Sequence, residues 1–177
     1  MEKGSPDVRH ECHLVCGPPA AGKTVLARRL ADELGACLLD SDQVSEPLVQ
    51  AGLLLAGMSP DDRDSPAYKS AFREPVYQTL FALAREHLCR GPVVIAGPFT
   101  TETSSDDGLD RLTSALGHPV TVHFVWCSPD ERRRRIERRG EKRDEPKLAD
   151  WDRYVATCRE EPPVWPHEFV DTGAGGR

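Results

Sequence analysis

The segment Gly17-Pro18-Pro19-Ala20-Ala21-Gly22-Lys23-Thr24 spells the pattern G-x-x-x-x-G-K-[ST]. It lies between a short apolar run and a helical pattern, which is the context that a phosphate-binding loop requires. Glycine lets the backbone curl so that N–H groups point inward at a phosphate, and the dipole of the following helix favours an anion. Lys23 then supplies a positive charge to the β- and γ-phosphates, and Thr24 supplies a hydroxyl to Mg²⁺. We therefore predict that this segment binds ATP together with Mg²⁺.

Outward from this loop, short apolar runs alternate with helical patterns. Apolar runs bounded by polar residues, glycine or proline predict strands at residues 13–16, 37–39, 93–96, 120–126 and 167–170. Apolar spacing, capping serines and prolines predict helices at residues 23–34, 43–57, 65–90, 105–116, 129–139 and 149–160. Strands that are apolar on both faces and separated by helices indicate a parallel sheet with helices on each side. The predicted fold class is α/β, a three-layer α/β/α sandwich with a five-stranded parallel sheet.

The composition is typical of a soluble globular protein. The 177 residues suit a single domain over residues 1–177, with a loose tail at residues 1–10. No apolar segment approaches the roughly 20 residues that span a bilayer, so we expect no membrane partner. Residues 1–9 are polar, which predicts no secretory signal and a cytoplasmic location. The net charge of −6 argues against nucleic-acid binding over the whole surface, although the arginine-rich segment 131–143 departs from this balance.

Further segments indicate the class of phosphate-loop protein. The N-K-x-D motif of GTPases is absent, and the third predicted strand ends in Ala96-Gly97-Pro98 rather than in the carboxylates usual in oligomeric ATPases. Together with the phosphate loop, the segment Leu39-Asp40-Ser41-Asp42, the turn after residue 96 and the arginine-rich segment resemble the P-loop small-molecule kinases. Shikimate kinase, gluconate kinase, chloramphenicol phosphotransferase and small actinobacterial kinase-like proteins of the AAA family ATPase type are similar in this way. The resemblance implies a P-loop NTPase fold with a lid, and ATP-dependent phosphorylation of an alcohol.

Two aspartates after the second predicted strand are candidates for the chemistry. In the similar kinases an Asp-x-Asp stands at this point, which implies that Asp42 contacts the acceptor hydroxyl and takes its proton. It also implies that Asp40 helps to hold Mg²⁺. The end of a parallel strand places both side chains at the carboxyl edge of the sheet, where ligands of such folds bind. Asp42 is thus predicted, with Lys23, to be catalytic and to contact substrate; the alternative is that Asp42 only caps the next helix.

Three other residues are candidates for contact with the acceptor. The resemblance to shikimate kinase implies that the turn after the third strand lines the acceptor pocket, where Gly97 allows close backbone approach and Thr100 donates a hydrogen bond. Arg73, on the long helix 65–90, is a candidate to grip a carboxylate or phosphate, although the aromatic residues around it at helical spacing are typical of a core. The segment Asp61-Asp62-Arg63-Asp64 suits a polyhydroxylated or cationic acceptor, such as an aminoglycoside-like compound or a nucleoside.

The arginine-rich segment is predicted to belong to a lid over residues 129–148. In the similar kinases the helix after the fourth strand leads into a lid whose arginines close on the phosphates, and Gly140 is expected to end that helix here. The predicted catalytic arginines are Arg139 and Arg143, with Arg135 as a further nucleotide contact. Four consecutive arginines cannot all face one ligand, because successive helix residues differ by about 100°. Most of them are therefore predicted to be solvated or ion-paired.

The loop after the last predicted strand is the final candidate. In the similar kinases this loop lies beside the adenine, which implies that Asp171 and Thr172 contact the nucleotide through their backbone.

These features predict an ATP-dependent phosphotransferase whose partner is a small hydroxylated molecule, in a monomer or homodimer. A polynucleotide or nucleoside 5′-kinase is an alternative, but nucleic acid is the less favoured partner because no aromatic residues interleave with the arginines. A zeta-toxin-like kinase of nucleotide sugars is a further variant. An alternative from another class is a nucleotide-binding regulator with little turnover, which the missing carboxylate on the third strand supports.

Overall fold

Five short strands form the centre of the structure, a computed structural model that describes residues 10–63 and 65–173, except the side chain of Arg143. The strands are β1 (Cys12–Cys16), β2 (Cys37–Asp40), β3 (Val93–Ala96), β4 (Val120–Trp126) and β5 (Glu168–Asp171). All of them are parallel, in the order β2-β3-β1-β4-β5. The central strand β1 is paired on both sides, so that Cys12 lies opposite both Val93 and Val120. The five-stranded parallel sheet predicted from the sequence is confirmed.

Helices connect the strands, as the alternating pattern predicts. They are α1 (Lys23–Leu34), α2 (Ser41–Leu55), α3 (Pro66–Leu88), α4 (Thr100–Thr103), α5 (Gly108–Leu116), α6 (Pro129–Arg139), η1 (Lys142–Asp144, a 3₁₀ turn), α7 (Glu145–Ala149) and α8 (Trp151–Ala156). Within the described residues, no helix is both long enough and apolar enough to cross a membrane.

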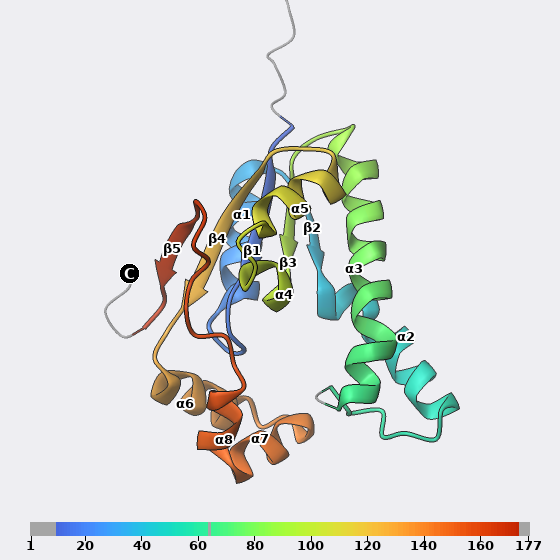
Figure 1. Ribbon diagram of the computed structural model, residues 1–177, viewed down its shortest axis with the longest axis vertical. Coiled ribbons are helices and arrows are strands. Elements are labelled where there is room, and N and C mark those ends of the chain that lie inside the picture. Colours follow the sequence, from blue (N-terminus) through green and yellow to red (C-terminus); the bar gives the residue numbers. More distant parts are fainter. Residues whose placement is uncertain (1–9, 64, 174–177) are drawn as a thin grey trace, which may run out of the picture.

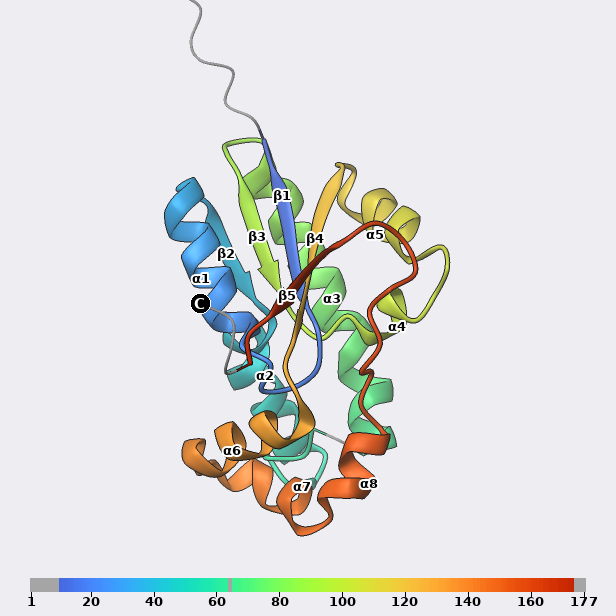
Figure 2. The same cartoon turned by 90° about the vertical axis from the view of Figure 1, so that its left-hand side faces the viewer.

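Both faces of the sheet are covered by helices (Figures 1 and 2). α1 covers one face, where Leu26 packs in a core with Val15 of β1. α3 and α5 cover the other face, where Leu80 and Leu112 pack with Leu14. Leu14 and Val15 belong to different cores because successive residues of a strand point to opposite faces. The three layers of the predicted α/β/α sandwich are therefore present.

Two groups of helices lie beyond the carboxyl ends of the strands (Figure 1). α2 and the first turns of α3 lie on one side, and the lobe formed by α6, η1, α7 and α8 lies on the other. The phosphate loop, residues 17–24, lies at this same edge, because it follows the carboxyl end of β1 and leads into α1. The predicted lid, residues 129–148, corresponds to the first part of this lobe. Gly140 ends α6, as predicted, and has a φ of 63°. Residues 1–9 of the predicted tail lie outside the described part of the chain.

Several helix boundaries differ from the predicted ones. α2 begins two residues before the predicted residue 43, because the side chain of Asp40 accepts hydrogen bonds at its N-terminus. The predicted helix 149–160 corresponds to α8, which begins only at Trp151, because the side chain of Asp150 caps it there, and ends at Ala156. α5 begins at Gly108 rather than at residue 105. α4 was not predicted, because its 4 residues are too few to show a helical period.

Candidate active site

The phosphate loop, residues 17–24, adopts a backbone conformation that depends on its glycines. Gly17 has a φ of 132° and Gly22 a φ of 102°, and Ala20 between them also has a positive φ of 61°. A Cβ atom on Gly17 would lie 2.1 Å from the carbonyl oxygen of Val125, so only glycine fits there. α1 begins directly after Gly22, and no side chain caps it. The N-terminal N–H groups and dipole of α1 are therefore presented to an anion bound in the loop.

Lys23 is half-buried inside this loop. Its Nζ donates hydrogen bonds to the carbonyl oxygens of Gly17, at 3.0 Å, and Pro18, at 2.8 Å. Burial lowers the pKa of the Lys23 ammonium to about 8. The negative charge of Asp42 raises this pKa, and the positive charge of Arg132 lowers it further. An anionic phosphate in the loop would stabilise the charged form of this ammonium.

Thr24 and Asp40 meet at the start of α1 and form a pair of oxygen donors. The Thr24 hydroxyl donates to Asp40 Oδ2 at 3.0 Å, and Asp40 is only 6% exposed. The other carboxylate oxygen, Oδ1, accepts hydrogen bonds from the backbone N–H groups of Asp42 at 3.0 Å and Gln43 at 3.4 Å. Mg²⁺ prefers oxygen ligands and binds proteins through one or two carboxylates together with substrate phosphates. The chemistry of Thr24 and Asp40, beside a phosphate loop, fits such an ion.

Asp42 lies in the first turn of α2 with its side chain exposed. Its charge raises the pKa of Lys23, so the carboxylate lies within electrostatic range of the phosphate-loop ammonium. The cap of α2 is Asp40 and not Asp42, so the interpretation of Asp42 as a helix cap is wrong. The side chain lines an open cleft of about 460 Å³. The other residues that line this cleft are Gln43, Glu46, Gln50, Asp61, Glu141 and Lys142.

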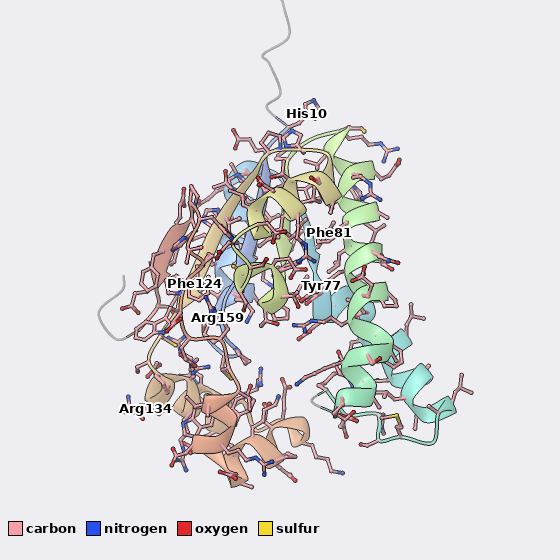
Figure 3. All side chains as sticks on the ribbon, in the orientation of Figure 1. His10, Tyr77, Phe81, Phe124, Arg134 and Arg159 are labelled. Atoms are coloured by element: carbon pink, nitrogen blue, oxygen red, sulfur yellow. The ribbon has the colours of Figure 1, made fainter. Side chains whose placement is uncertain are left out.

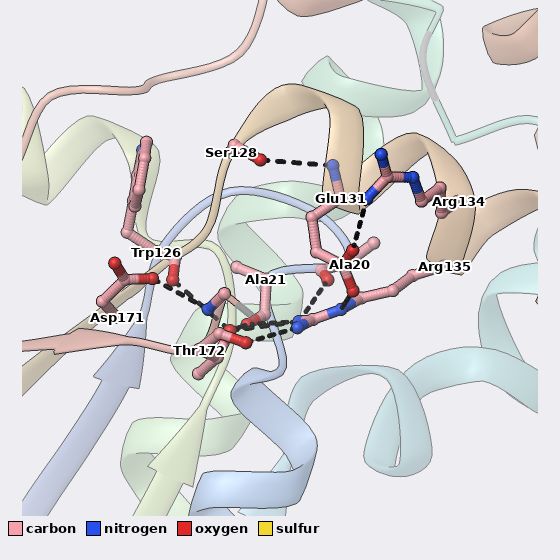
Figure 4. Close-up of polar contacts among 10 residues, drawn as sticks. Ala20, Ala21, Trp126, Ser128, Glu131, Arg134, Arg135, Asp171 and Thr172 are labelled. Atoms are coloured by element: carbon pink, nitrogen blue, oxygen red, sulfur yellow. Dashed lines mark hydrogen bonds and ion pairs between the residues drawn. The ribbon is translucent and has the colours of Figure 1, made fainter. Parts of the chain in front are cut away.

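Arg135 connects the phosphate loop to the loop after β5 (Figure 4). Its Nη1 donates to the carbonyl oxygens of Ala20 at 3.3 Å and Ala21 at 3.2 Å, and to the hydroxyl of Thr172 at 3.0 Å. Its Nη2 donates to the Thr172 carbonyl at 2.5 Å, and its Nε contacts Glu131 at 3.0 Å. The structure thus brings together the predicted nucleotide contacts Arg135 and Thr172. Asp171, beside them, accepts a hydrogen bond from the N–H of Gly173.

The arginines predicted to be catalytic are Arg139 and Arg143, and Arg139 is bound to carboxylates of the same lobe. Arg139 binds the buried carboxylate of Asp144 through Nε, at 2.9 Å, and through Nη2, and it contacts Glu141 at 3.6 Å. Burial alone would raise the pKa of Asp144, but hydrogen bonds from Arg139 and Lys147 outweigh it and hold that pKa low. In this arrangement Arg139 closes the turn after α6. The side chain of Arg143 lies outside the described part of the structure.

The residues predicted to contact the acceptor lie near the start of α4. Arg73 donates through Nη2 to the hydroxyl of Thr100. A Cβ atom on Gly97 would lie 2.9 Å from the ring of Phe99 and 3.3 Å from Ser41 Oγ, so Gly97 permits close packing at this point. Phe99 is held by a hydrogen bond of 3.0 Å from its N–H to the Tyr77 hydroxyl. Two of the predicted acceptor contacts, Arg73 and Thr100, are therefore hydrogen-bonded to each other. Gly97 instead makes room for the ring of Phe99, which is a packing role.

Sequence reasoning missed the ion pair between the buried Arg132 of α6 and the half-buried Glu160. The Arg132 side chain is 0% exposed and binds Glu160 through Nη2. A sequence signal was present, because Arg132 lies four residues before Ile136, which is also buried. Residues four apart share one face of a helix. This signal was obscured by the arginines around it, which make the whole helix look exposed.

The chain is similar to known proteins both in sequence and in fold. A family model described as "AAA domain" matches residues 12–162. A gluconokinase from Sinorhizobium meliloti 1021 is 17% identical with a TM-score of 0.55, over 91% of this chain and 81% of that one. A sugar kinase from Janibacter sp. HTCC2649 is 18% identical with a TM-score of 0.57, over 91% and 84%. Kti12 of Chaetomium thermophilum, in complex with ADP-AlF3, is 17% identical with a TM-score of 0.57, over 92% and 89%.

These likenesses establish that the fold is that of P-loop kinases. No curated protein sequence matches the chain.

Proposed function

The chain belongs to the AAA domain family, and on this premise we propose that it is an ATP-dependent kinase that phosphorylates a hydroxyl of a small molecule. The observation that carries the proposal is the arrangement of three side chains at one edge of the sheet. Thr24 and Asp40 are hydrogen-bonded at the start of α1, and Asp42, two residues after Asp40, lines the cleft of about 460 Å³. An oriented hydroxyl, a proton acceptor and charge neutralisation are what phosphoryl transfer requires of a protein.

Each residue has a defined part in the proposed reaction. The backbone N–H groups of the phosphate loop and the Lys23 ammonium bind the phosphates of ATP, and Thr24 and Asp40 hold Mg²⁺. The metal ion, when bound, neutralises charge on the phosphate oxygens. The acceptor oxygen forms a bond to the γ-phosphorus while the bond to the β–γ bridging oxygen breaks, and the electrons of that bond remain on ADP. The hydroxyl proton passes to Asp42, which later releases it to water.

The lining of the cleft favours an acceptor with hydroxyl or amino groups over a sugar acid. Among the described residues that line the cleft, Asp42, Glu46, Asp61 and Glu141 carry carboxylates, and Lys142 is the one basic residue. Arg63 contacts Glu46 at 2.7 Å and Arg139 contacts Glu141 at 3.6 Å, so the local balance is acidic without being extreme. An anionic acceptor would be repelled by this field, whereas a polyhydroxylated neutral or cationic one would not. We therefore include polyols, aminoglycoside-like compounds and nucleosides among the acceptors.

The same contacts weaken the case for a nucleic-acid acceptor. Much of the positive charge of α6 is already compensated: Arg133 pairs with Glu137, and Arg134 and Arg135 both pair with Glu131. A basic groove that follows a nucleic-acid backbone needs charges that face the ligand. A regulator with little turnover is the second candidate, because β3 is followed by Gly97 and Pro98 and ends without a carboxylate.

The test is ADP release by the purified protein with ATP and Mg²⁺, against polyols, aminoglycosides, nucleosides, sugar acids and a 5′-hydroxyl oligonucleotide. The proposal expects that one neutral or cationic compound accelerates ADP release many-fold and gains the mass of one phosphate. Stimulation by the oligonucleotide alone would instead indicate a polynucleotide kinase. Tight ATP binding without stimulation by any class would favour the regulator.

A further inference from the structure

A second pocket lies between α3 on one side and α4 and α5 on the other, where Figure 3 shows Tyr77 and Phe81. Its volume is about 260 Å³, and it shares no lining residue with the cleft of about 460 Å³. Tyr77, Phe81 and Arg85 line it from α3, because residues three to four apart share one face of a helix. Pockets for drug-sized molecules have volumes of roughly 300–1,000 Å³, so an occupant of this pocket would be smaller than a nucleotide.

Glu102 of α4 brings into this pocket a carboxylate oxygen that the protein leaves unsatisfied. Its side chain lines the pocket, and its Oε2 is buried and has no hydrogen-bond partner among the described residues. The other acidic residue of the pocket, Glu74, differs from it, because Glu74 accepts a hydrogen bond of 3.0 Å from Gln78. A buried carboxylate oxygen without a donor costs free energy and calls for an explanation. An ammonium group in the pocket would supply the donor and the opposite charge.

Two arginines line the same pocket and offer donors to an anion. Arg85 donates through Nη1 to the carbonyl oxygen of Ala115, in the last turn of α5, and Arg111 lies one turn earlier on α5. Neither arginine forms an ion pair with a residue that the structure describes. The planar guanidinium group matches the geometry of a carboxylate and binds it through two parallel hydrogen bonds. The pocket therefore contains a place for a carboxylate as well as one for an ammonium.

The acidic and basic groups lie at opposite ends of the pocket. The hydroxyl of Tyr77 accepts a hydrogen bond of 3.0 Å from the N–H of Phe99, which directly precedes α4, so Glu102 lies at the Tyr77 end. Arg85 follows Tyr77 by eight residues on α3, which is about 12 Å along the helix axis. The contact of Arg85 with Ala115 joins that end of the pocket to α5.

The floor between the two ends is aromatic and well packed. The ring of Tyr77 lies 4.8 Å from that of Phe99, and the ring of Phe81 lies 6.1 Å from it, measured between ring centres. Leu112 of α5 lines the pocket as well and is 1% exposed. An apolar, pre-formed surface between two charged ends suits a hydrocarbon chain.

We propose that this pocket binds an elongated zwitterion, a small molecule with an ammonium at one end, a carboxylate at the other and an apolar chain between them. Glu102 binds the ammonium, Arg85 and Arg111 bind the carboxylate, and the chain lies on Tyr77 and Phe81. An α-amino acid fits less well, because both of its charges are carried on one carbon. The proposal goes beyond the kinase function, which uses none of these residues. The competing explanation is that only water enters the pocket.

The experiment measures, by calorimetry and without ATP, the binding of β-alanine, γ-aminobutyrate and ε-aminocaproate to the full chain. Hexylamine and hexanoate each carry one of the two charges, and norleucine is an isomer of ε-aminocaproate with both charges on one carbon. At least one of the three ω-amino acids is expected to bind about 10-fold or more tightly than all of these controls, because it makes charged hydrogen bonds at both ends.

Variants then assign the two ends of the pocket. Glu102→Gln and Arg111→Ala are each expected to weaken binding of the best ω-amino acid about 10-fold, the effect of losing a charged hydrogen bond. In Glu102→Gln that compound should bind no more tightly than hexanoate, because only its carboxylate is still recognised. The control is Glu86→Gln, at an exposed glutamate of α3 that does not line the pocket, and it should leave the affinity unchanged.

The proposal is overturned if no ω-amino acid binds more tightly than the controls, or if Glu102→Gln leaves the affinity unchanged. Thermal unfolding shows whether each variant is folded. If Glu102→Gln does not fold, Arg111→Ala decides, because Arg111 is exposed on α5: weaker binding supports the proposal and unchanged binding overturns it. The assay contains neither ATP nor an acceptor. Its failure therefore leaves the kinase function standing, and a protein that phosphorylates no compound can still bind the zwitterion.

Discussion

The Thr24 hydroxyl donates a hydrogen bond of 3.0 Å to Asp40 Oδ2 and so joins the first turn of α1 to the end of β2. Asp40 uses its second oxygen, Oδ1, to cap α2 through the N–H groups of Asp42 and Gln43. One carboxylate therefore orients the candidate metal ligand Thr24 and also fixes the start of the helix that carries Asp42. The candidate metal site and the candidate proton acceptor are coupled through Asp40.

Replacement of Asp40 is expected to affect both of its contacts. Asp40→Ala removes the helix cap and should lower the free energy of unfolding by about 1 kcal/mol. It should also raise the Mg²⁺ concentration needed for ATP binding, because a carboxylate near the metal site is lost. Asp40→Asn keeps an oxygen for the cap and should restore most of the stability but not the Mg²⁺ dependence. Loss of stability without any change in Mg²⁺ dependence would show that Asp40 is only a cap.

Replacement of Asp42 is expected to separate chemistry from nucleotide binding. Asp42→Asn keeps the shape of the side chain but cannot accept a proton at neutral pH, so kcat should fall about 100-fold or more. ATP affinity, measured by calorimetry, should change little because Lys23 and the loop are intact. The matched control is Asp61→Asn, in the same cleft, which should alter the KM of the acceptor more than kcat. Unchanged turnover in Asp42→Asn would favour the regulator.

Lys23 provides a prediction about pH. The folded-state pKa, about 8, lies below the ordinary value of 10.5, so between these values the unfolded state binds more protons. The free energy of unfolding should therefore rise as the pH increases from about 8 to about 10.5. Below pH 8 the buried ammonium is charged and destabilises the folded state to its full extent. Lys23→Met should abolish this rise and stabilise the nucleotide-free protein at pH 7 by less than the roughly 3 kcal/mol that the pKa shift corresponds to, because the two hydrogen bonds of the ammonium are lost as well. Urea unfolding at a series of pH values measures both effects.

ATP binding is expected to depend on the same ammonium with the opposite sign. As the pH rises through about 8, Lys23 loses its proton and with it the charge that attracts the phosphates. ATP affinity should decline over this range in the wild type and should be weak at all pH values in Lys23→Met. An affinity that is flat from pH 7 to pH 9.5 would contradict the assignment.

Gly17 is expected to tolerate no side chain. In Gly17→Ala the new Cβ would lie 2.1 Å from the carbonyl oxygen of Val125, at a φ of 132° that alanine rarely adopts. Unfolding free energy should fall by about 3 kcal/mol or more, and ATP binding should be lost with the loop conformation. Gly91→Ala is the control, since a Cβ there meets nothing within 4 Å, and its stability should change little. Thermal unfolding of the two variants decides this prediction.

The helices and strands with long, regular patterns were predictable because their apolar spacing is local. The core strands β1 and β3 are bounded by glycine, proline or a charged residue, and β4 follows Pro119 and ends just before Cys127-Ser128-Pro129. The predicted ends of all three agree with the structure to within one residue. The short segments were less predictable. α4 has too few residues for a period, and the start of α8 depends on a capping contact between Asp150 and Arg153.

The candidate site was predictable in its motifs but not in its pairings. The sequence indicated Thr24, Asp40 and Asp42, and the structure brings Thr24 and Asp40 into contact. It did not indicate that Arg139 would bind Asp144, because the turn at Gly140 folds the chain back on α6. Nor did it indicate that Asp40, rather than Asp42, would cap α2, because either side chain is a good cap at that spacing.

The sequence by itself determined the parallel sheet, the phosphate loop and the edge at which both aspartates stand, because each depends on residues that are neighbours in the chain. Only the tertiary structure decided which distant partner each arginine of α6 meets. The spacing of Arg132 to Ile136 indicates only that both lie on one face of α6. The tertiary structure pairs Arg132 with Glu160, 28 residues away, and Arg135 with Thr172, 37 residues away. A charged side chain is stable inside a protein only where a distant partner satisfies it, and local spacing contains no information about that partner.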